Sequence, residues 1–282
     1  MLLRFTKMHG LGNDFVLLDL VTQDFQLREE QVSLLADRRT GIGFDQLLIA
    51  QPPEDPTMDF RYRIFNADGS EAEQCGNGAR CFVQFVRDRG LTTKSKLVLE
   101  TVNGSIACQI ERDGNISVNM GPPILQPAKI PFIANRPGIV YDFEIPSMVG
   151  SDKDKICLSV VSMGNPHAVI TVDDIDTAPV AYLGPLIEKD PRFPARVNVG
   201  FMQVISRNKI KLRVFERGVG ETRACGTGAC AAVVAGRLQG ILDSQVEVSL
   251  AGGDLEIAWH GDQQPVFMTG PASRVYEGRL QI

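Results

Sequence analysis

Short apolar runs alternate with turn signals in two parts of the chain. In the first part, runs at 97–101, 106–110 and 116–120 are separated by Asn103-Gly104 and Asp113-Gly114. These dipeptides favour the tight turns of β-hairpins. The pattern therefore predicts a meander of antiparallel strands. Similar runs at 245–250, 255–259 and 266–268 predict a second meander.

A helical period follows each of two Cys-Gly-x-Gly segments. Apolar residues 82, 83 and 86 follow the first segment, and residues 233, 234 and 238 follow the second. Spacings of one, three and four residues place such side chains on one face of a helix. Gly90 and Gly240 stand where each helix is expected to end, because glycine is the common residue just past a helix C-terminus.

The two halves of the chain resemble each other. Four segment pairs recur in the same order, namely 12–16 with 164–169, 41–47 with 198–204, 71–79 with 221–229, and 118–122 with 266–271. A repeat in this register indicates two copies of one α/β unit. The proline-rich stretch between Gly121 and Pro131 is unsuited to a continuing strand or helix, so it predicts the boundary between the copies.

Composition narrows the function classes. The 282 residues carry a formal net charge of −5 and are 44% hydrophobic and 22% charged, which is typical of a soluble globular protein. Lys and Arg are scattered, so no nucleic-acid surface is expected. Neither a signal peptide nor a membrane span is predicted, and six cysteines without a secretion signal are expected to be reduced thiols in the cytoplasm.

The Cys-Gly-x-Gly segments suggest acid/base chemistry. A thiol at a helix N-terminus is expected to have a lowered pKa, because unpaired N–H groups and the helix dipole favour the thiolate. The glycines leave backbone N–H groups open to an anion. Two such sulfurs, Cys75 and Cys225, on opposite faces of one carbon would be a base and an acid for inverting a stereocentre.

The remaining cysteines and the glycine segments do not indicate other chemistry. Cys81, Cys108, Cys157 and Cys230 are expected to be inert packing thiols. Zinc is disfavoured, because the paired cysteines are six and five residues apart and not at Cys-x2-Cys spacing. Neither glycine segment has the Lys-Ser/Thr ending of a phosphate-binding P-loop.

One histidine and several asparagines adjoin the repeated motifs. His167 lies in Gly-Asn-Pro-His, where a titratable ring could tune a thiol. The asparagines near the motifs are read as hydrogen-bonding groups for a polar ligand; they are Asn13, Asn66, Asn165 and Asn198.

These blocks together resemble the diaminopimelate epimerase family over essentially the whole chain. The resemblance lies in residues 10–15, 66–80, 164–167 and 215–230. It implies conversion of LL-2,6-diaminopimelate to the meso isomer in lysine biosynthesis, without pyridoxal phosphate or metal. It also implies a homodimer and an α/β fold of the α+β type. Two pseudo-symmetric domains, each a mostly antiparallel sheet around a central helix, would flank a cleft. Residues 1–121 with 271–282 would form one half, and 122–270 the other.

The resemblance also implies roles for individual residues. Cys75 and Cys225 would be the catalytic pair, with Cys75 serving the L-configured centre. The reacting carboxylate would be held by Gly76, Asn77, Gly226 and Thr227. The reacting amino end would be surrounded by Asn13, Gln46, His167 and Glu216, with His167 and Glu216 tuning the thiols. The distal end would meet Asn66, Asn165, Asn198 and Arg217, the last as a planar fork for a carboxylate.

Three rivals remain open at this stage. A proline racemase-like enzyme would share the two cysteines but would not need Arg217 for a second carboxylate. A non-catalytic amino-acid binding protein would not require two thiols. A pyridoxal-phosphate racemase would need a Schiff-base lysine, and no lysine lies in the repeated motifs.

Overall fold

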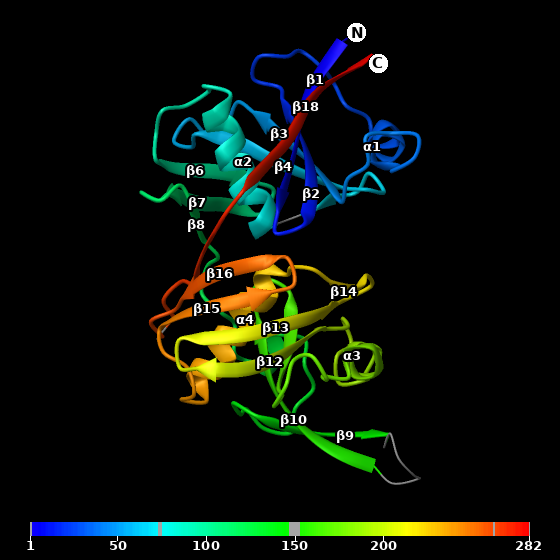
Figure 1. Ribbon diagram of the computed structural model, residues 1–282, viewed down its shortest axis with the longest axis vertical. Coiled ribbons are helices and arrows are strands. Elements are labelled where there is room, and N and C mark those ends of the chain that lie inside the picture. The colour runs from blue at the N-terminus through cyan, green and yellow to red at the C-terminus, as the bar shows by residue number, and fades with distance from the viewer. Residues whose placement is uncertain (1, 73–74, 147–152, 262, 282) are drawn as a thin grey trace. The chain divides into compact units, whose positions relative to one another are not determined.

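The computed structural model describes residues 2–72, 75–146, 153–261 and 263–281 (Figure 1). Glu73 and Gln74, part of one repeated segment, lie outside the described residues. The chain divides into two units, Met1–Asn119 with Thr269–Ile282 (unit 1) and Met120–Met268 (unit 2). The sequence predicted boundaries after residues 121 and 270. The observed boundaries, after residues 119 and 268, each lie two residues earlier.

Unit 1 is a sheet with two helices. Its elements are β1 (Leu2–Gly10), β2 (Asn13–Asp19), α1 (Glu29–Ala36), β3 (Gln46–Gln51), β4 (Phe60–Asn66), β5 (Glu71–Ala72), α2 (Gly76–Asp88), β6 (Lys96–Thr101), β7 (Gly104–Ile110), β8 (Ile116–Asn119) and β18 (Ser273–Gln281). The pairs β1–β2, β3–β4, β4–β5, β6–β7 and β7–β8 are antiparallel, while β2–β3 and β4–β6 are parallel. Strand β18 returns from the end of the sequence to pair with β1.

Unit 2 repeats this arrangement. Its elements are the 3-10 helix η1 (Pro127–Lys129), β9 (Tyr141–Pro146), β10 (Lys153–Ser162), β11 (Pro166–Thr171), α3 (Val180–Glu188), β12 (Asn198–Ser206), β13 (Lys209–Glu216), β14 (Gly220–Thr222), α4 (Gly226–Leu238), β15 (Gln245–Leu250), β16 (Gly253–Ala258) and β17 (Phe267–Gly270), whose end crosses into unit 1. The parallel pairs are β11–β12 and β13–β15. The pairs β10–β11, β12–β13, β13–β14 and β15–β16 are antiparallel. The element order and pairing from β1 to β7 thus recur from β10 to β16, which is the structural form of the sequence repeat.

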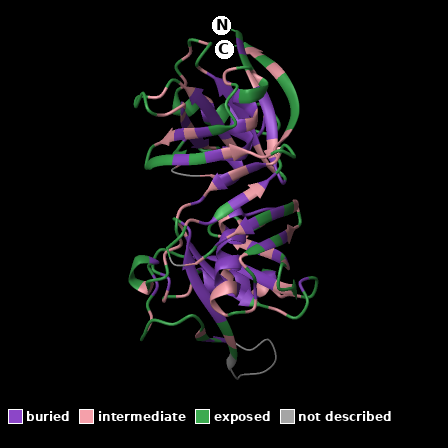
Figure 2. Cartoon of the chain, turned by 90° about the vertical axis from the view of Figure 1, so that its left-hand side faces the viewer, coloured by how far each residue is buried: buried purple, intermediate pink, exposed green. Residues whose placement is uncertain are grey.

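A helix lies at the centre of each unit. Helix α2 packs against β1, β2, β3, β7 and β8, and α4 packs against β10, β11, β12, β13 and β16. Ten residues of each 13-residue helix are buried, among the purple segments of Figure 2. A helix buried on most of its circumference needs small or apolar residues nearly all round, and both sequences supply them. The α+β fold with central helices is therefore as predicted.

The helix ends also follow the sequence prediction. Arg89 and Gln239 are the C-caps, and the next residues, Gly90 and Gly240, have φ of +69° and +75°. Such positive φ values are readily adopted by glycine, which is why it ends so many helices. Among the described residues, no helix combines the length and apolar character needed to cross a membrane.

A second apolar layer in each unit involves the other helix. In unit 1, Val32 and Leu35 of α1 join Val16, Leu47 and Ile49 from the sheet. In unit 2, residues of α3 join β11 and β12 in a cluster that also holds stacked rings of Phe132, Phe143 and Phe193. The sheets therefore carry apolar layers around α1 and α3 in addition to those around α2 and α4, which keeps the strands that carry the site residues in place.

Candidate active site

Cys75 is the N-cap of the central helix of unit 1. Its backbone is extended, with φ −147° and ψ 105°, and its Sγ accepts a hydrogen bond from the backbone N–H of Gly78 at 3.3 Å. The Oδ1 atom of Asn13 lies 3.9 Å from the same sulfur. The thiol is half-buried. It is therefore held by the helix terminus on one side and remains partly accessible to solvent on another.

Cys225 is the N-cap of the central helix of unit 2. Its backbone has nearly the same conformation, with φ −121° and ψ 106°. Its Sγ lies 3.6 Å from the hydroxyl oxygen of Thr227. The residue is buried, with 4% of its surface exposed. The structure thus places both predicted cysteines at the same position of two matching helices.

The pKa of Cys225 differs from the sequence expectation. Burial raises it well above its usual value, and the negative charge of Glu216 raises it further, against a smaller lowering by Thr227. A helix terminus contributes only about 0.3 to 2 kcal/mol in favour of a thiolate, which full burial exceeds. The expectation that a helix N-terminus lowers this pKa was wrong for Cys225, which is a neutral thiol in this structure.

The second glycine of each motif is required by close packing. A Cβ on Gly78 would lie 2.4 Å from Tyr62 Oη, and a Cβ on Gly228 would lie 3.0 Å from a methyl of Val214 and 3.2 Å from Cys225 Sγ. The hydroxyl of Tyr62 also donates to the carbonyl of Cys75 at 3.3 Å. Tyr62 was missed from sequence because it lies in an ordinary strand pattern far from the motif.

The predicted polar residues of unit 1 form two neighbouring pairs. Gln46 and Asn66 lie opposite each other on β3 and β4, and Gln46 Nε2 donates to Asn66 Oδ1 at 3.0 Å. Asn77 is buried, and its Nδ2 lies 3.5 Å from Asn13 Oδ1. Asn13 is the first residue of β2, and Phe15, two residues later in the same strand, pairs with Gln46. Four predicted side chains therefore share one end of the unit 1 sheet.

A corresponding set gathers in unit 2. His167 on β11 pairs with Asn198 on β12, and one ring nitrogen, Nε2, lies 3.0 Å from Asn165 Oδ1. Asn198 is buried and accepts from the backbone N–H of Arg217 at 2.8 Å. The guanidinium of Arg217 donates to the carbonyl of Ala195 at 2.8 Å. The amide of Asn198 thus fixes the backbone from which Arg217 extends.

His167 is neutral near pH 7. Burial lowers its pKa to about 3, with a further contribution from the charge of Arg217. Its Nδ1 is buried and has no hydrogen-bond partner within the described residues. The ring expected to tune a thiol by titrating is therefore uncharged near pH 7, because it is fully enclosed. A neutral imidazole can still donate or accept a hydrogen bond at that nitrogen.

Glu216 lies at the end of β13, within electrostatic reach of Cys225. Its carboxylate accepts a hydrogen bond from the hydroxyl of Thr222 on β14. Thr222 was not predicted as a site residue, although it lies in the same repeated segment as Glu221 and Cys225. Its hydroxyl holds the carboxylate that acts on the thiol.

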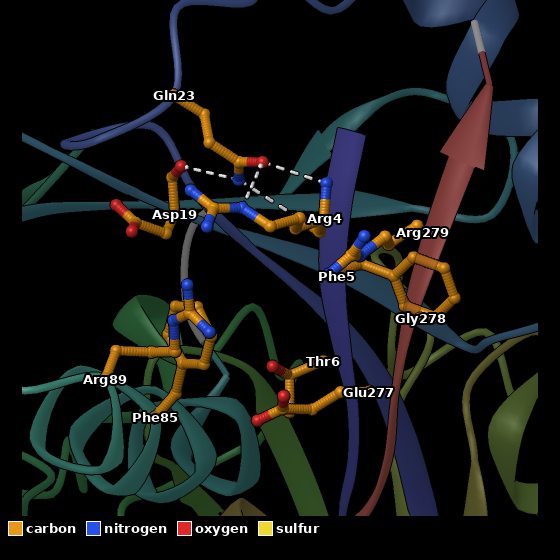
Figure 3. A pocket seen from close by; sticks show the side chains of 10 residues that line it. All are labelled: Arg4, Phe5, Thr6, Asp19, Gln23, Phe85, Arg89, Glu277, Gly278 and Arg279. Atoms are coloured by element: carbon orange, nitrogen blue, oxygen red, sulfur yellow. Dashed lines mark hydrogen bonds between the residues drawn. The ribbon is translucent and has the colours of Figure 1, made fainter. Parts of the chain in front are cut away.

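A cavity of about 230 Å³ lies elsewhere in unit 1, beside β1 and β18 (Figure 3). Gln23 spans part of its rim through hydrogen bonds with the backbones of Arg4 and Asp19. Its lining includes none of the predicted site residues. Within the described ranges, no cluster of three or more His, Cys, Asp or Glu side chains is arranged to hold a metal ion.

Comparison with known sequences gives a consistent family. The sequence model of diaminopimelate epimerase matches residues 5–126 and 159–275. Curated proteins with that name from Ectopseudomonas mendocina (strain ymp) and Pseudomonas fluorescens (strain Pf0-1) are 56% and 58% identical over 282 residues, covering 100% of both chains in each case.

Solved structures share the fold at low identity. A phenazine biosynthesis protein of the PhzF family from Bacillus anthracis aligns with a TM-score of 0.72 at 18% identity, covering 100% of both chains. A probable proline racemase from Agrobacterium radiobacter aligns with a TM-score of 0.69 at 17% identity, covering 99% of this chain and 92% of the other. Such likenesses concern the fold alone.

Proposed function

The chain belongs to the diaminopimelate epimerase family, isomerases of lysine biosynthesis, and we propose that it interconverts LL- and meso-2,6-diaminopimelate by passing a proton between Cys75 and Cys225. One observation carries the mechanism. Two matching units each present a cysteine as the N-cap of a buried central helix. In the proposed enzyme, these two sulfurs flank the α-carbon of a single substrate molecule.

The two thiols act in opposite senses. In the LL-to-meso direction, Cys75 as a thiolate removes the α-proton from the L-configured centre. Cys225 then delivers a proton to the opposite face of the planar carbon. The raised pKa of Cys225 supports this role, because a group that keeps its proton at pH 7 is available as an acid. In reverse, the roles are exchanged.

The helix termini stabilise the charge that develops on the substrate. The backbone N–H groups of Gly76 and Asn77, and of Gly226 and Thr227, belong to the first turns of α2 and α4, where N–H groups point out of the helix end. Such preorganised donors, aimed at a carboxylate becoming a dianion, contribute roughly 3 to 4 kcal/mol each where one has been removed from an oxyanion site. The weak acidity of the α-proton is the main barrier to the reaction. Donors of this strength lower that barrier by stabilising the charge that forms when the proton leaves.

The polar side chains divide between the two ends of the substrate. Asn13, Gln46, His167 and Glu216 surround the reacting amino group in this proposal. The distal end meets Asn66, Asn165, Asn198 and Arg217. Arg217 has no ion-pair partner within the described residues, and its planar fork suits a carboxylate. A second carboxylate on the substrate distinguishes this reaction from that of a proline racemase-like enzyme.

The reaction as proposed requires no cofactor. Both acid/base groups come from the chain, and the electron sink is the substrate carboxylate held by backbone N–H groups. The repeated motifs contain no lysine that could form a Schiff base with pyridoxal phosphate. The site residues named above are sufficient for the proton transfer.

A homodimer is proposed through unit 1. Strand β18 has most of its residues exposed, and Val275 and Tyr276 are 55% and 45% exposed. Beside it lies a hollow of about 530 Å³ whose lining includes Leu34, which is 71% exposed. Apolar surface at a sheet edge is typical of a subunit interface. Sedimentation equilibrium should give a dimer for the natural chain and a monomer for Val275→Glu; a monomeric natural chain would contradict this.

The cytoplasm is the proposed location. All six cysteines lie within the described residues, and each is a thiol outside any disulfide. The proposed mechanism requires Cys75 and Cys225 to remain reduced, a condition that the cytosol maintains.

Isotope incorporation tests the proposed reaction. The chain is incubated with LL-diaminopimelate in heavy water without added cofactor, and the α-carbons of substrate and product are followed by NMR. We expect meso product with deuterium at the inverted centre, while early unreacted LL substrate stays largely unlabelled, because the two faces are served by different thiols. Cys157→Ala, which removes an exposed thiol, is the matched control and should behave like the natural chain. Absence of inversion would contradict the function, and equal early labelling of substrate and product would contradict the two-thiol mechanism.

A further inference from the structure

Asp45 holds one end of the Asn13 amide. Its Oδ2 accepts from Asn13 Nδ2 at 2.9 Å and from the backbone N–H of Asp14 at 3.0 Å. Its Oδ1 accepts from the guanidinium of Arg38 at 2.8 Å. Asp45 directly precedes β3, so it is fixed next to Gln46. Arg38 therefore fixes the carboxylate through Oδ1, while Oδ2 is the oxygen that bonds to Asn13.

Arg80 holds the other end of the same chain of amides. It is fully buried on α2, and its Nη2 donates to Asn77 Oδ1 at 3.0 Å. Its Nε donates to the carbonyl of Pro271 at 3.2 Å. Asn77 then turns its Nδ2 toward Asn13 Oδ1, 3.5 Å away. Two amides, Asn77 and Asn13, thus lie between a buried guanidinium and a carboxylate, all within unit 1.

The charged ends fix the direction of both amides. A guanidinium only donates, and an ionised carboxylate only accepts. Arg80 therefore requires the oxygen of Asn77, and Asp45 requires the nitrogen of Asn13. The remaining atom of Asn13, its Oδ1, is left facing the Cys75 sulfur at 3.9 Å. A flipped Asn13 amide would place its NH2 against the NH2 of Asn77.

We propose that Asp45 is a positioning residue that, with Arg80 at the far end, orients the Asn13 amide so that its carbonyl oxygen faces Cys75 and the amino group of the substrate. This inference rests on the proposed function for the identity of the substrate. Asp45 acts through Asn13 and does not itself touch the reacting atoms.

The orientation has two chemical effects. A carbonyl oxygen accepts a hydrogen bond from a substrate ammonium, whereas an amide NH2 in the same place would oppose it with its own protons. The same oxygen accepts from a neutral thiol and not from a thiolate. Asp45 therefore sets both how the amino end is bound and how readily Cys75 gives up its proton.

Two other titratable groups near Cys75 in the described part of the chain do not supply this effect. Tyr62 and Cys81 are fully buried, and burial raises both pKa values, that of Cys81 to about 12. Both are neutral near pH 7. Arg80 and Asp45 are the charged residues that these contacts bring to the two amides, and Arg38 in turn pairs with Asp45 and Asp14. Substituting Asp45 changes the network at its more exposed end, where 45% of the side chain is accessible.

A double-mutant cycle tests the proposal. We expect Asp45→Asn, which keeps the size and removes the charge, to lower kcat/KM by about 10- to 100-fold, the effect of a lost charged hydrogen bond. In an Asn13→Ala background the same substitution should change kcat/KM by less than about 2-fold, because Asp45 acts through Asn13. Equal losses in both backgrounds, or an unaffected single variant, would overturn the proposal.

The matched control is Asp243→Asn in unit 2. Asp243 also pairs with an arginine, Arg207 at 2.9 Å, and its side chain is 51% exposed, but it touches no proposed site residue. It should keep the activity of the natural chain. Arg80→Lys is a second variant at the other end of the network and should show the same coupling to Asn13→Ala. Circular dichroism checks the fold of every variant.

Thiol alkylation provides a readout that needs no substrate. Iodoacetamide modification of Cys75, followed by peptide mass spectrometry across pH, gives the pKa of that thiol. We expect a lower pKa in Asp45→Asn than in the natural chain, because the freed amide can turn an N–H toward the thiolate; an unchanged pKa would overturn the proposal. If the natural chain fails to epimerise diaminopimelate, the proposed function fails, and alkylation still decides the role of Asp45.

Discussion

Arg38 meets Asp14 with both of its terminal nitrogens, at 2.9 and 2.7 Å, while Lys7 approaches the same carboxylate from β1. Burial acts to raise the pKa of Asp14, but the hydrogen bonds from Arg38 and Lys7, with the charge of Lys7, hold it well below its usual value. Because the folded pKa is lowered, the stabilisation is present above the unfolded pKa of about 3.9 and is lost as the pH falls toward the folded value.

Asp14→Asn should therefore destabilise the protein in a pH-dependent manner. At pH 7 we expect a loss of about 2 kcal/mol in the free energy of unfolding, the scale of a charged hydrogen bond. As the pH falls below about 4 the difference from the natural chain should shrink, since the carboxylate of the natural chain becomes protonated first in the unfolded state and only at still lower pH in the folded state. Urea titrations across pH measure it, and a difference independent of pH would contradict the ion-pair explanation.

Gly78→Ala should destabilise unit 1 mainly through its contact with Tyr62. The new methyl would lie 2.4 Å from Tyr62 Oη, so the ring or the helix must shift, at a cost of roughly 1 to 3 kcal/mol. Tyr62→Phe removes the atom that is too close. The double variant Tyr62→Phe/Gly78→Ala should recover part of the loss in thermal unfolding; a double variant as unstable as the sum of the two singles would show that another contact is responsible.

His167 should remain neutral throughout the range in which the enzyme works. Its pKa of about 3, lowered by burial and by Arg217, predicts neutral imidazole signals down to about pH 4 in carbon-proton NMR spectra. The chain has three histidines, so His167→Gln assigns the resonance by its loss. Titration of that signal near pH 6.5 would contradict the buried neutral ring.

Cys225→Ala should reduce turnover severely. Loss of a positioned acid/base group lowers the rate by about 10²- to 10⁴-fold. We expect the kcat of Cys225→Ala to be lower than that of the natural chain by at least this factor. A Cys75→Ala/Cys225→Ala variant should be scarcely worse than either single variant, because the pair works as a unit. Steady-state epimerisation assays measure both, and independent, multiplicative losses would argue against a shared proton transfer.

Arg217→Lys should weaken substrate binding more than catalysis. A lysine keeps the charge but loses the planar fork that pairs with a carboxylate, so we expect KM to rise by about 10-fold or more with a smaller change in kcat. The backbone N–H that Asn198 accepts from is retained, so the local fold should persist. A large loss of kcat with unchanged KM would place Arg217 at the reacting end instead.

Much of the fold follows from local pattern. The two meanders, the central helices and their glycine ends follow from hydrophobic period and turn residues, and β6, β7, β15 and β16 lie where the pattern predicts strands. The parallel pairs β2–β3 and β11–β12 were not predicted, because parallel pairing joins residues far apart in sequence and leaves no turn signal between them.

The candidate site residues follow from sequence motifs, whereas their electrostatics do not. Repeat position singled out Cys75 and Cys225 from six cysteines. The raised pKa of Cys225 depends on how completely its surroundings enclose it, and the neutrality of His167 depends on the same property. Enclosure results from side chains that approach from distant strands, as Tyr62 approaches Gly78, and the pattern along the chain does not encode those approaches.

The pairing of β18 with β1 bears on how the protein is made. During synthesis, every residue of unit 2 is produced before the strand that neighbours β1 in the finished sheet. Unit 1 therefore cannot be completed before all of unit 2 has been synthesised. This differs from the usual progression along a nascent chain, in which all residues of the leading domain are available before the next domain is made.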